Sequence, residues 1–568
     1  MKKNWGLFVT GWILILGGSY LAHRVQTAGG VNVQDVRFPG DSGVVMSGLL
    51  YTPSTASEHS GQHRSPAVLL SHGYINTREM QSPFAIELSQ RGFVVLAMDM
   101  TGHGYSTGRV SSQGYGGPAA LRYLRSLPTV DTLNIGMEGH SMGGGPILAA
   151  ALKSPNDYKS MVLEGSAPGV FGGKATAGTL TFPRNLAVVF GRYDEFANLM
   201  WHEFKGSDIG GSDKARALFG VTGSAEPGKV YGSIDSGTAR VLFLPSVTHP
   251  AEHFSVGGVA PAVDWFQRTL KGVPLRHVAT DQSWIWKEVG TLAGFIGFVL
   301  LLLGTFELLL HTPYFIKLNV AALPTIDVRG PRWWLAFAVT AAVPALTFYP
   351  FMKFGAIFAP SRFFPQGIMN QLIVWALLNG LLTMVLSAGL RSRRAKFRLN
   401  SAKSFFLALG TTAVGYMSLA LVDRLFTVDF RFWVLGLKPL DAKHFRIALT
   451  YVVPWTVFFM TSLRALNIYM AVKNEKAATQ YVAAALAMCT GFATLLLVQY
   501  ASLFGTGQLF SPLQALNTII AIQFVPLLAV VGLISAFTFR RTNATSPGAF
   551  ICAMLVTWYI VAGTAVHV

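Results

Sequence analysis

Hydrophobic and polar positions divide this chain into three parts. Residues 5–22 form one apolar run behind two lysines, residues 28–283 alternate short apolar runs with amphipathic stretches, and residues 284–568 contain long apolar runs. The pattern predicts an N-terminal signal-anchor helix within 1–27, an α/β domain over 28–283, and a transmembrane domain of about eight helices over 284–568.

The middle part predicts a mainly parallel sheet of eight strands. Its short runs are rich in Val and Leu and are bounded by Gly, Pro or Asp, as expected of strands buried on both faces. These runs are 31–38, 44–51, 66–73, 93–99, 133–139, 159–165, 185–191 and 239–245. Helix-like segments at 80–92, 115–128 and 144–154 lie between several of them, which indicates repeated β-α-β units. The Gly-rich segment 195–239 reads as an insertion that could cover a site.

The last part contains eight apolar runs long enough to cross a bilayer. They lie near 289–310, 333–352, 368–390, 404–422, 446–463, 481–503, 513–537 and 549–566. Sixteen Lys and Arg fall on the side of Lys2 and Lys3, including the basic run 391–398, and eight fall on the other side. This bias places the N-terminus in the cytoplasm and the α/β domain outside it. Gln26 is a poor residue for a cleavage site ending at Ala28, so an uncleaved anchor is favoured over a signal peptide.

Charge and cysteine content exclude several classes of protein. Residues 28–283 contain 20 basic and 20 acidic residues, so the formal charge of +18 arises in the apolar parts. A basic excess beside apolar runs indicates membrane topology rather than nucleic-acid binding. Cys489 and Cys552, the two cysteines, both lie in apolar runs, which leaves no disulfide framework or cysteine-based metal site. No cofactor or metal is expected.

Two segments match the pattern Gly-x-Ser-x-Gly: GHSMG at 139–143 and GYSTG at 104–108. A nucleophile elbow needs a strand that runs directly into the serine and a helix that leaves it. Ser141 has both, with small residues where strand and helix crowd together. Ser106 follows its strand through a loop and is interpreted as a loop serine, with Asp99 fixing the loop backbone. Ser141 is therefore the predicted nucleophile.

The partners of the serine follow in the order that this fold requires. Asp194 comes directly after the strand at 185–191, with Glu195 as an alternative acid. His249 comes directly after the last strand, with His253 as the alternative base, expected to face solvent or the insertion. A serine hydroxyl needs the imidazole as a base, and the carboxylate orients that imidazole.

The oxyanion hole is predicted from two backbone amides. One belongs to Met142, after the nucleophile, and the other to Tyr74, in the loop after the strand at 66–73. The Tyr74 hydroxyl could contribute instead, or the ring could simply form a pocket wall.

These residues resemble the serine α/β-hydrolase superfamily. The run SHGYINTREMQSPFAIELSQRGFVVLAMDMTGHGYSTG is similar to dienelactone-hydrolase-like esterases and serine aminopeptidase-like hydrolases, as are GHSMGG and GRYDEF. The resemblance covers about 30–280 and implies the fold and the triad, but one fold hosts many reactions. The cap often inserted after the sixth strand is absent, and the membrane half resembles no known family.

The expected function is a multi-pass, cell-membrane hydrolase of carboxylic esters with its catalytic domain outside the cytoplasm. Membrane lipids are expected partners and lipid or acyl esters are expected substrates. A peptidase, an acyltransferase, or a transporter or sensor with a ligand-binding hydrolase-like domain remain alternatives, and oligomeric state is open. The segment 423–445 is expected to form an interfacial helix touching lipid headgroups. Glu307, inside a span, is a candidate functional carboxylate.

Overall fold

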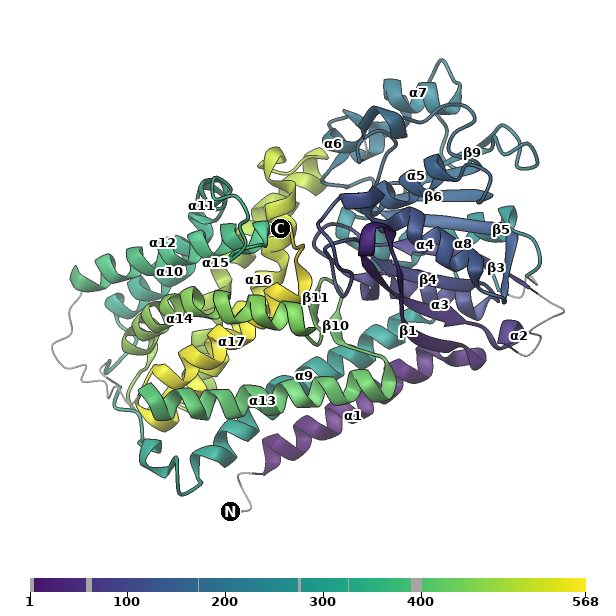
Figure 1. The fold of residues 1–568 in the computed structure, drawn as a ribbon. Coiled ribbons are helices and arrows are strands. Elements are labelled where there is room, and N and C mark those ends of the chain that lie inside the picture. The colour runs from purple at the N-terminus through teal and green to yellow at the C-terminus, as the bar shows by residue number, and fades with distance from the viewer. Residues whose placement is uncertain (1–4, 58–63, 172, 274–276, 325, 390–400) are drawn as a thin grey trace.

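The computed structural model describes residues 5–57, 64–171, 173–273, 277–324, 326–389 and 401–568. Lys2, Lys3 and the basic run 391–398, on which the predicted orientation partly rests, lie outside these residues. The chain forms a sheet-centred region and a helical region that pack against each other (Figure 1).

The sheet has the order β1-β2-β4-β3-β5-β6-β7-β9-β8. The pairs from β4 through β3, β5, β6 and β7 to β9 are parallel, and β2 joins β1 and β4 antiparallel. The strands are β1 (Asn32–Pro39), β2 (Val45–Thr52), β3 (Ser65–Ser71), β4 (Val94–Asp99), β5 (Val130–His140), β6 (Ser160–Glu164), β7 (Leu186–Val189), β8 (Val230–Tyr231) and β9 (Arg240–Phe243). The eight predicted strands are all present. The ninth, β8, is a two-residue strand contributed by the segment 195–239, which has too little apolar periodicity to reveal it.

Helices cover both faces of the sheet, as buried parallel strands require. Successive residues of β4 alternate between the two resulting cores: Leu96 packs into one with α4 and α5, and Val95 into the other with α3 and α8. The helices of this region are α2 (Ser54–Ser57), α3 (Ser82–Gln90), α4 (Gly117–Ser126), α5 (Gly144–Lys153), α6 (Ala197–Trp201), α7 (Asp213–Phe219) and α8 (Val256–Thr269). The predicted α/β architecture is confirmed.

Among the described residues, eight helices are long and apolar enough to cross a membrane. A ninth span is formed if α10 and α11, bent by 42° at their junction, count as one. The helices are α1 (Gly6–Gln26), α9 (Trp284–Leu310), α10 (Pro331–Leu346), α11 (Phe348–Gly355), α12 (Gly367–Gly389), α13 (Ser401–Phe426), α14 (Ala442–Met470), α15 (Ala477–Thr506), α16 (Ala515–Thr542) and α17 (Ser546–Gly563). This set corresponds to the nine predicted apolar runs.

The N-terminal helix α1 packs along α9 through glycines. A side chain at Gly18 would lie 2.4 Å from the carbonyl oxygen of Gly290, and one at Gly304 would lie 2.4 Å from the amide of Phe8. Small residues let two helix backbones approach in the way that membrane helices favour. The first apolar run is therefore an integral part of the helical region in this structure.

The expectation of an interfacial helix within 423–445 is wrong. Between α13 and α14 the chain forms a β-hairpin of β10 (Phe430–Phe432) and β11 (Leu435–Leu437), with Trp433 in the turn at φ 52°. Apolar residues recur at every second position, Phe430 and Phe432 on one strand and Leu435 and Leu437 on the other, which fits a hairpin that docks on the sheet region. Its cations are buried: Lys438 donates to both Glu79 oxygens at 2.9 and 3.0 Å.

Glu307 has a structural partner. Its carboxylate accepts a hydrogen bond from the Arg541 guanidinium, near the C-terminal ends of α9 and α16. A carboxylate paired in this way needs no further role to explain its presence in an apolar helix.

Candidate active site

Ser141 lies on a tight bend between β5 and the helix that follows. Its φ of 56° is left-handed, a conformation that a serine adopts only where the surroundings impose it. A side chain at Gly143 would lie 2.2 Å from the Ser71 carbonyl oxygen, and one at Gly139 would lie 2.2 Å from that of Gly143. The prediction that small residues are needed around this serine is confirmed, and the bend has the geometry of a nucleophile elbow.

Asp194 and His249 form a close buried pair. Asp194 follows β7 and its Oδ2 lies 2.7 Å from the Nδ1 of His249, which follows β9. His249 and Ser141 line the same pocket. Burial lowers the pKa of His249, but the charge and hydrogen bond of Asp194 outweigh it, so that this pKa lies above its ordinary value. The structure thus brings the three predicted residues together at the carboxyl ends of the parallel strands.

Glu195 has a different partner from Asp194. Its Oε2 accepts a hydrogen bond from the backbone amide of His249 at 2.8 Å, and its Oε1 accepts one from the hydroxyl of Tyr500, on α15, at 2.7 Å. Burial and the neighbouring Asp194 raise the pKa of Glu195 to about 7. Glu195 therefore fixes the backbone that carries His249, while Asp194 orients its ring.

His253 does not face solvent or the insertion, as expected of it, but lines the same pocket as Ser141. It is 2 % exposed and its ring packs edge-on against His140 with centroids 4.5 Å apart. The reason is that residues 249–254 form a tight helical turn after β9, which buries both histidines in the wall of the pocket. Burial, followed by the nearby His249, lowers the pKa of His253 to about 3. No carboxylate among the described residues pairs with this ring, and a ring that stays neutral in this way is poorly suited to be the base.

Glu252 is a part of the site that sequence reasoning missed. Its Oε1 accepts a hydrogen bond from the Gly191 amide at 2.7 Å, and its Oε2 lies 3.2 Å from Nε2 of His140. Burial and the adjacent Asp194 raise its pKa well above the ordinary value. Its place three residues after His249, in the same turn, was the available signal.

Within the described residues, one group has metal-ligating donor atoms close together. Atoms of His140, His249 and Glu252 lie within 4.8 Å of one another. His249 already presents Nδ1 to Asp194, and His140 Nε2 lies 3.2 Å from the His249 carbonyl oxygen. These contacts describe a hydrogen-bonded network behind the serine rather than three ligands that converge on one point.

Gly165, at the end of β6, makes room for this network. Its φ is 54°, and a side chain there would lie 2.0 Å from Glu252 Oε2 and 2.8 Å from the His249 ring. Any larger residue would displace the base.

Ser106 is a structural serine. Its Oγ donates to the Asp99 carbonyl at 2.8 Å and accepts from the Ser47 amide at 2.9 Å. The Asp99 carboxylate accepts from the amides of Arg78 and Tyr105 at 2.9 and 3.0 Å. The interpretation of Ser106 as a loop serine and of Asp99 as a residue that fixes the loop agrees with these contacts.

The loop after β3 lies against the nucleophile. A side chain at Gly73 would lie 3.3 Å from the Cβ of Ser141, and the next residue, Tyr74, lines the pocket. The Tyr74 hydroxyl bonds to Nε2 of His567 at 3.1 Å, so it is engaged with the C-terminal segment. The Met142 amide lies in the first helical turn, where amides have no intrahelical acceptor. Both predicted oxyanion-hole amides thus stay candidates.

The helical region completes the pocket wall. Val434 of the hairpin and Leu516 and Ile519 of α16 line the pocket together with Ser141. From the segment 195–239, only Phe196 does so. Trp433 supports this arrangement because its indole donates to the Pro250 carbonyl, beside His249, at 2.6 Å. The residues that cover the site come mainly from α16 and the hairpin rather than from the insertion.

Comparison with known proteins agrees with this geometry. A family described as alpha/beta hydrolase fold matches residues 66–199. The quorum-quenching protein AidA of Acinetobacter baumannii is 32% identical over 124 residues, which are 21% of this chain and 38% of that protein. A monoacylglycerol lipase of Mycolicibacterium smegmatis is 33% identical over 134 residues, 23% of this chain and 45% of that protein. The chain thus spans less than half the length of these curated relatives.

Solved structures also resemble part of the chain. The esterase Pf2001 of Pyrococcus furiosus is 16% identical, with 42% of this chain and 94% of that one covered and a TM-score of 0.31. A dienelactone hydrolase of Anabaena variabilis is 20% identical, with 42% and 99% covered and a TM-score of 0.30. From the family match and the geometry, the chain contains an α/β-hydrolase domain, joined to a region of apolar helices.

Proposed function

We propose that this protein is a membrane-embedded serine hydrolase that cleaves carboxylic esters through a Ser-His-Asp mechanism. The observation that carries the proposal is the pocket lined by Ser141 and His249. Nδ1 of the His249 ring lies 2.7 Å from Oδ2 of Asp194. A serine on a strained elbow, an imidazole and an orienting carboxylate are the parts that acyl transfer to a hydroxyl requires.

The reaction proceeds in two halves. His249 takes the proton of the Ser141 hydroxyl as its oxygen attacks the ester carbonyl, and the amides of Met142 and Tyr74 stabilise the resulting oxyanion. His249 then gives the proton to the leaving alcohol, which departs and leaves an acyl group on Ser141. Water then attacks the acyl carbonyl while His249 takes one of its protons. His249 passes that proton to the Ser141 oxygen as the bond between the serine and the acyl group breaks and the acid departs.

Lipid or acyl esters are the favoured substrates. Three apolar side chains of the helical region wall the pocket, namely Val434, Leu516 and Ile519. An apolar wall supplied by membrane-type helices suits an acyl chain better than a peptide. The similarity to a monoacylglycerol lipase supports the same choice.

The hydrolase domain is proposed to lie outside the cytoplasm, on the basis of the positive charges at the opposite ends of the spans. Single cysteines at the exposed positions Ser236 and Asn474, in a chain with both native cysteines replaced, test this. A membrane-impermeant maleimide should label Ser236→Cys in intact cells and Asn474→Cys only after lysis. The reverse pattern would overturn the orientation.

Fluorophosphonate labelling tests the chemistry. The protein should react covalently, and Ser141→Ala should abolish the reaction while Ser106→Ala retains it. Labelling of Ser141→Ala, or none of the parent protein, would contradict the mechanism and favour a ligand-binding domain. A panel of esters and aminoacyl amides separates esterase from peptidase, and added alcohol acceptors reveal acyl transfer.

A further inference from the structure

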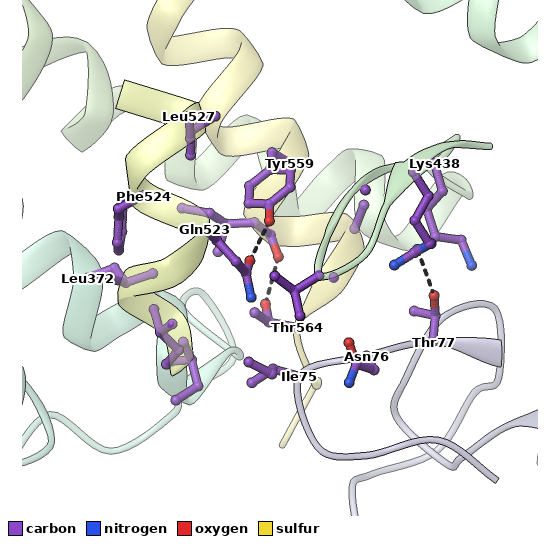
Figure 2. A pocket seen from close by; sticks show the side chains of 18 residues that line it. Ile75, Asn76, Thr77, Leu372, Lys438, Gln523, Phe524, Leu527, Tyr559 and Thr564 are labelled. Atoms are coloured by element: carbon purple, nitrogen blue, oxygen red, sulfur yellow. Dashed lines mark hydrogen bonds between the residues drawn. The ribbon is translucent and has the colours of Figure 1, made fainter. Parts of the chain in front are cut away.

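A second cavity opens beside the catalytic pocket, between the helical region and the loop after β3 (Figure 2). It is lined by the first half of α16, the start of α12, the last turns of α17, the hairpin and the loop after β3. Three residues, Ile75, Asn76 and Val434, line both this cavity and the pocket of Ser141. The two spaces therefore share a wall.

The far part of the cavity is apolar. Leu372 of α12 and Phe524 and Leu527 of α16 line it. Ile519, at the catalytic pocket, and Leu527 are eight residues apart on α16, about 12 Å along the helix axis. That length suits a medium-length alkyl chain that extends from the serine into the helical region.

The charges around the cavity are internally neutralised. Lys438 is paired with Glu79, and Arg431 donates to Asp429 Oδ2 at 3.1 and 3.0 Å. A charged group entering the cavity would lose its hydration without gaining an unpaired counter-charge. The lining thus favours an uncharged ligand.

Two amide side chains give the cavity polar groups of its own. Gln523 of α16 accepts from the Tyr559 hydroxyl and points toward the loop that carries Ile75 and Asn76 (Figure 2). Within the described part of the chain, neither the Gln523 amide nitrogen nor the Asn76 side chain has a protein hydrogen-bond partner. A neutral oxygen of the ligand, such as a carbonyl or a hydroxyl, can accept hydrogen bonds from these amide groups.

We propose that this cavity holds the non-reacting part of an uncharged amphiphilic ester, with its hydrocarbon chain against Leu372, Phe524 and Leu527 and an oxygen bonded to Gln523. The inference rests on the proposed esterase function. It makes the helical region a substrate-binding domain as well as an anchor.

A rival location for the ligand's hydrocarbon chain is the groove between the segment after β7 and the loop joining α15 to α16. Leu199 lines that groove and not the cavity. Matched substitutions therefore separate the two: Leu527→Trp fills the cavity, and Leu199→Trp fills the groove. Each is assayed in detergent with p-nitrophenyl acetate and p-nitrophenyl decanoate, and fluorophosphonate labelling confirms an intact triad.

Leu527→Trp should lower the ratio of kcat/KM for decanoate over acetate at least tenfold, and Leu199→Trp should leave that ratio within twofold of the parent value. An unchanged ratio in Leu527→Trp, or a fall in Leu199→Trp instead, would overturn the assignment. Failure of the parent protein to label or to hydrolyse either ester would refute the proposed function, which is a distinguishable result.

Gln523→Leu keeps a side chain of similar size and removes the amide. It therefore gives an independent test if the tryptophan variant fails to fold. We expect its KM for monodecanoylglycerol to rise about threefold to tenfold, the loss of one hydrogen bond. Competition by monodecanoylglycerol, and none by an anionic decanoyl phosphate, is expected in the parent protein. Stronger competition by the anion would overturn the uncharged-ligand assignment.

Discussion

Two segments of this chain share the pattern Gly-x-Ser-x-Gly, but their serines differ in backbone conformation, location and hydrogen bonding. Ser141 has a φ of 56°, lines a pocket, and lies between a strand and a helix. Ser106 lies in a loop, and its hydroxyl is used by the Asp99 carbonyl and the Ser47 amide. The glycines serve different purposes as well.

A side chain at Gly143 would collide with the Ser71 carbonyl, whereas one at Gly104 would lie 2.2 Å from the Asp99 carboxylate. The pattern therefore indicates only that the serine lies where the chain is closely packed and side chains at the neighbouring glycines would collide. Its chemistry depends on whether the neighbouring elements leave its hydroxyl free and bring a base to it.

The largest expected difference between the segments is in activity. Ser141→Ala should lower kcat by about 10⁴-fold to 10⁶-fold, because the nucleophile is lost. Ser106→Ala should leave labelling intact but destabilise the fold by about 1–3 kcal/mol, since the Ser47 amide loses a buried acceptor. Ester hydrolysis and thermal unfolding in detergent measure the two effects. Equal loss of activity in both variants would break the comparison.

The two acids should separate in the same way. Asp194→Asn should lower kcat by about 10⁴-fold with little change in unfolding temperature, because the His249 ring loses its orienting carboxylate. Asp99→Asn should instead destabilise the protein by about 2–4 kcal/mol, since Asp99 is buried beside Arg78. A catalytic defect in a well-folded Asp99→Asn protein would give GYSTG a role in the reaction.

The glycines give a smaller contrast. Gly143→Ala should reduce kcat about 100-fold by displacing the elbow, since misplacement of a catalytic group by 1 Å costs about that much. Gly104→Ala should chiefly lower the unfolding temperature, because its side chain would meet Asp99 at a φ of 50°. The ratio of labelling rate to folded fraction distinguishes the two outcomes.

The smallest expected effect concerns Glu195, which contacts the backbone of His249. The His249 ring must be neutral to act as a base, so kcat/KM should rise with pH through the elevated pKa of His249. The charge of Glu195 helps to raise that pKa, so Glu195→Gln should shift the rise to lower pH. Activity should stay within about threefold at high pH, where the ring is neutral in both proteins. A shift to higher pH would contradict the electrostatic argument.

Stability provides the companion measurement. The pKa of Glu195 rises from 4.5 to about 7 on folding. Its contribution to stability is thus fully present below pH 4.5 and is lost as the pH rises to about 7. Glu195→Gln should lack this part of the pH dependence, as unfolding measured across that range would show.

Local pattern was sufficient for much of the molecule. Strands such as β4 are continuous apolar runs because both of their faces are buried, and that signal is visible without coordinates. The order of Ser141, Asp194 and His249 along the chain follows from the connectivity of a parallel sheet. The apolar runs of the second half likewise reveal the long apolar helices, because each run is long enough to cross a bilayer.

Contacts between distant segments were not predictable in this way. The hairpin β10–β11 carries the cations and aromatics of an interfacial helix, and only its docking against Glu79 and Pro250 explains why it is extended and buried. His253 has the spacing of an exposed helical residue, yet a tight turn brings it into the pocket. The wall of the pocket involves Ile519, more than 370 residues from Ser141.

By itself, the sequence determined the two kinds of region, the nucleophile's segment and the order of its partners, because these depend on periodicity and short-range connectivity. Only the tertiary structure decided which of Asp194 and Glu195 faces the His249 ring, where His253 lies, and what closes the site. Those outcomes depend on side chains that meet across hundreds of residues, and no local pattern records such a meeting.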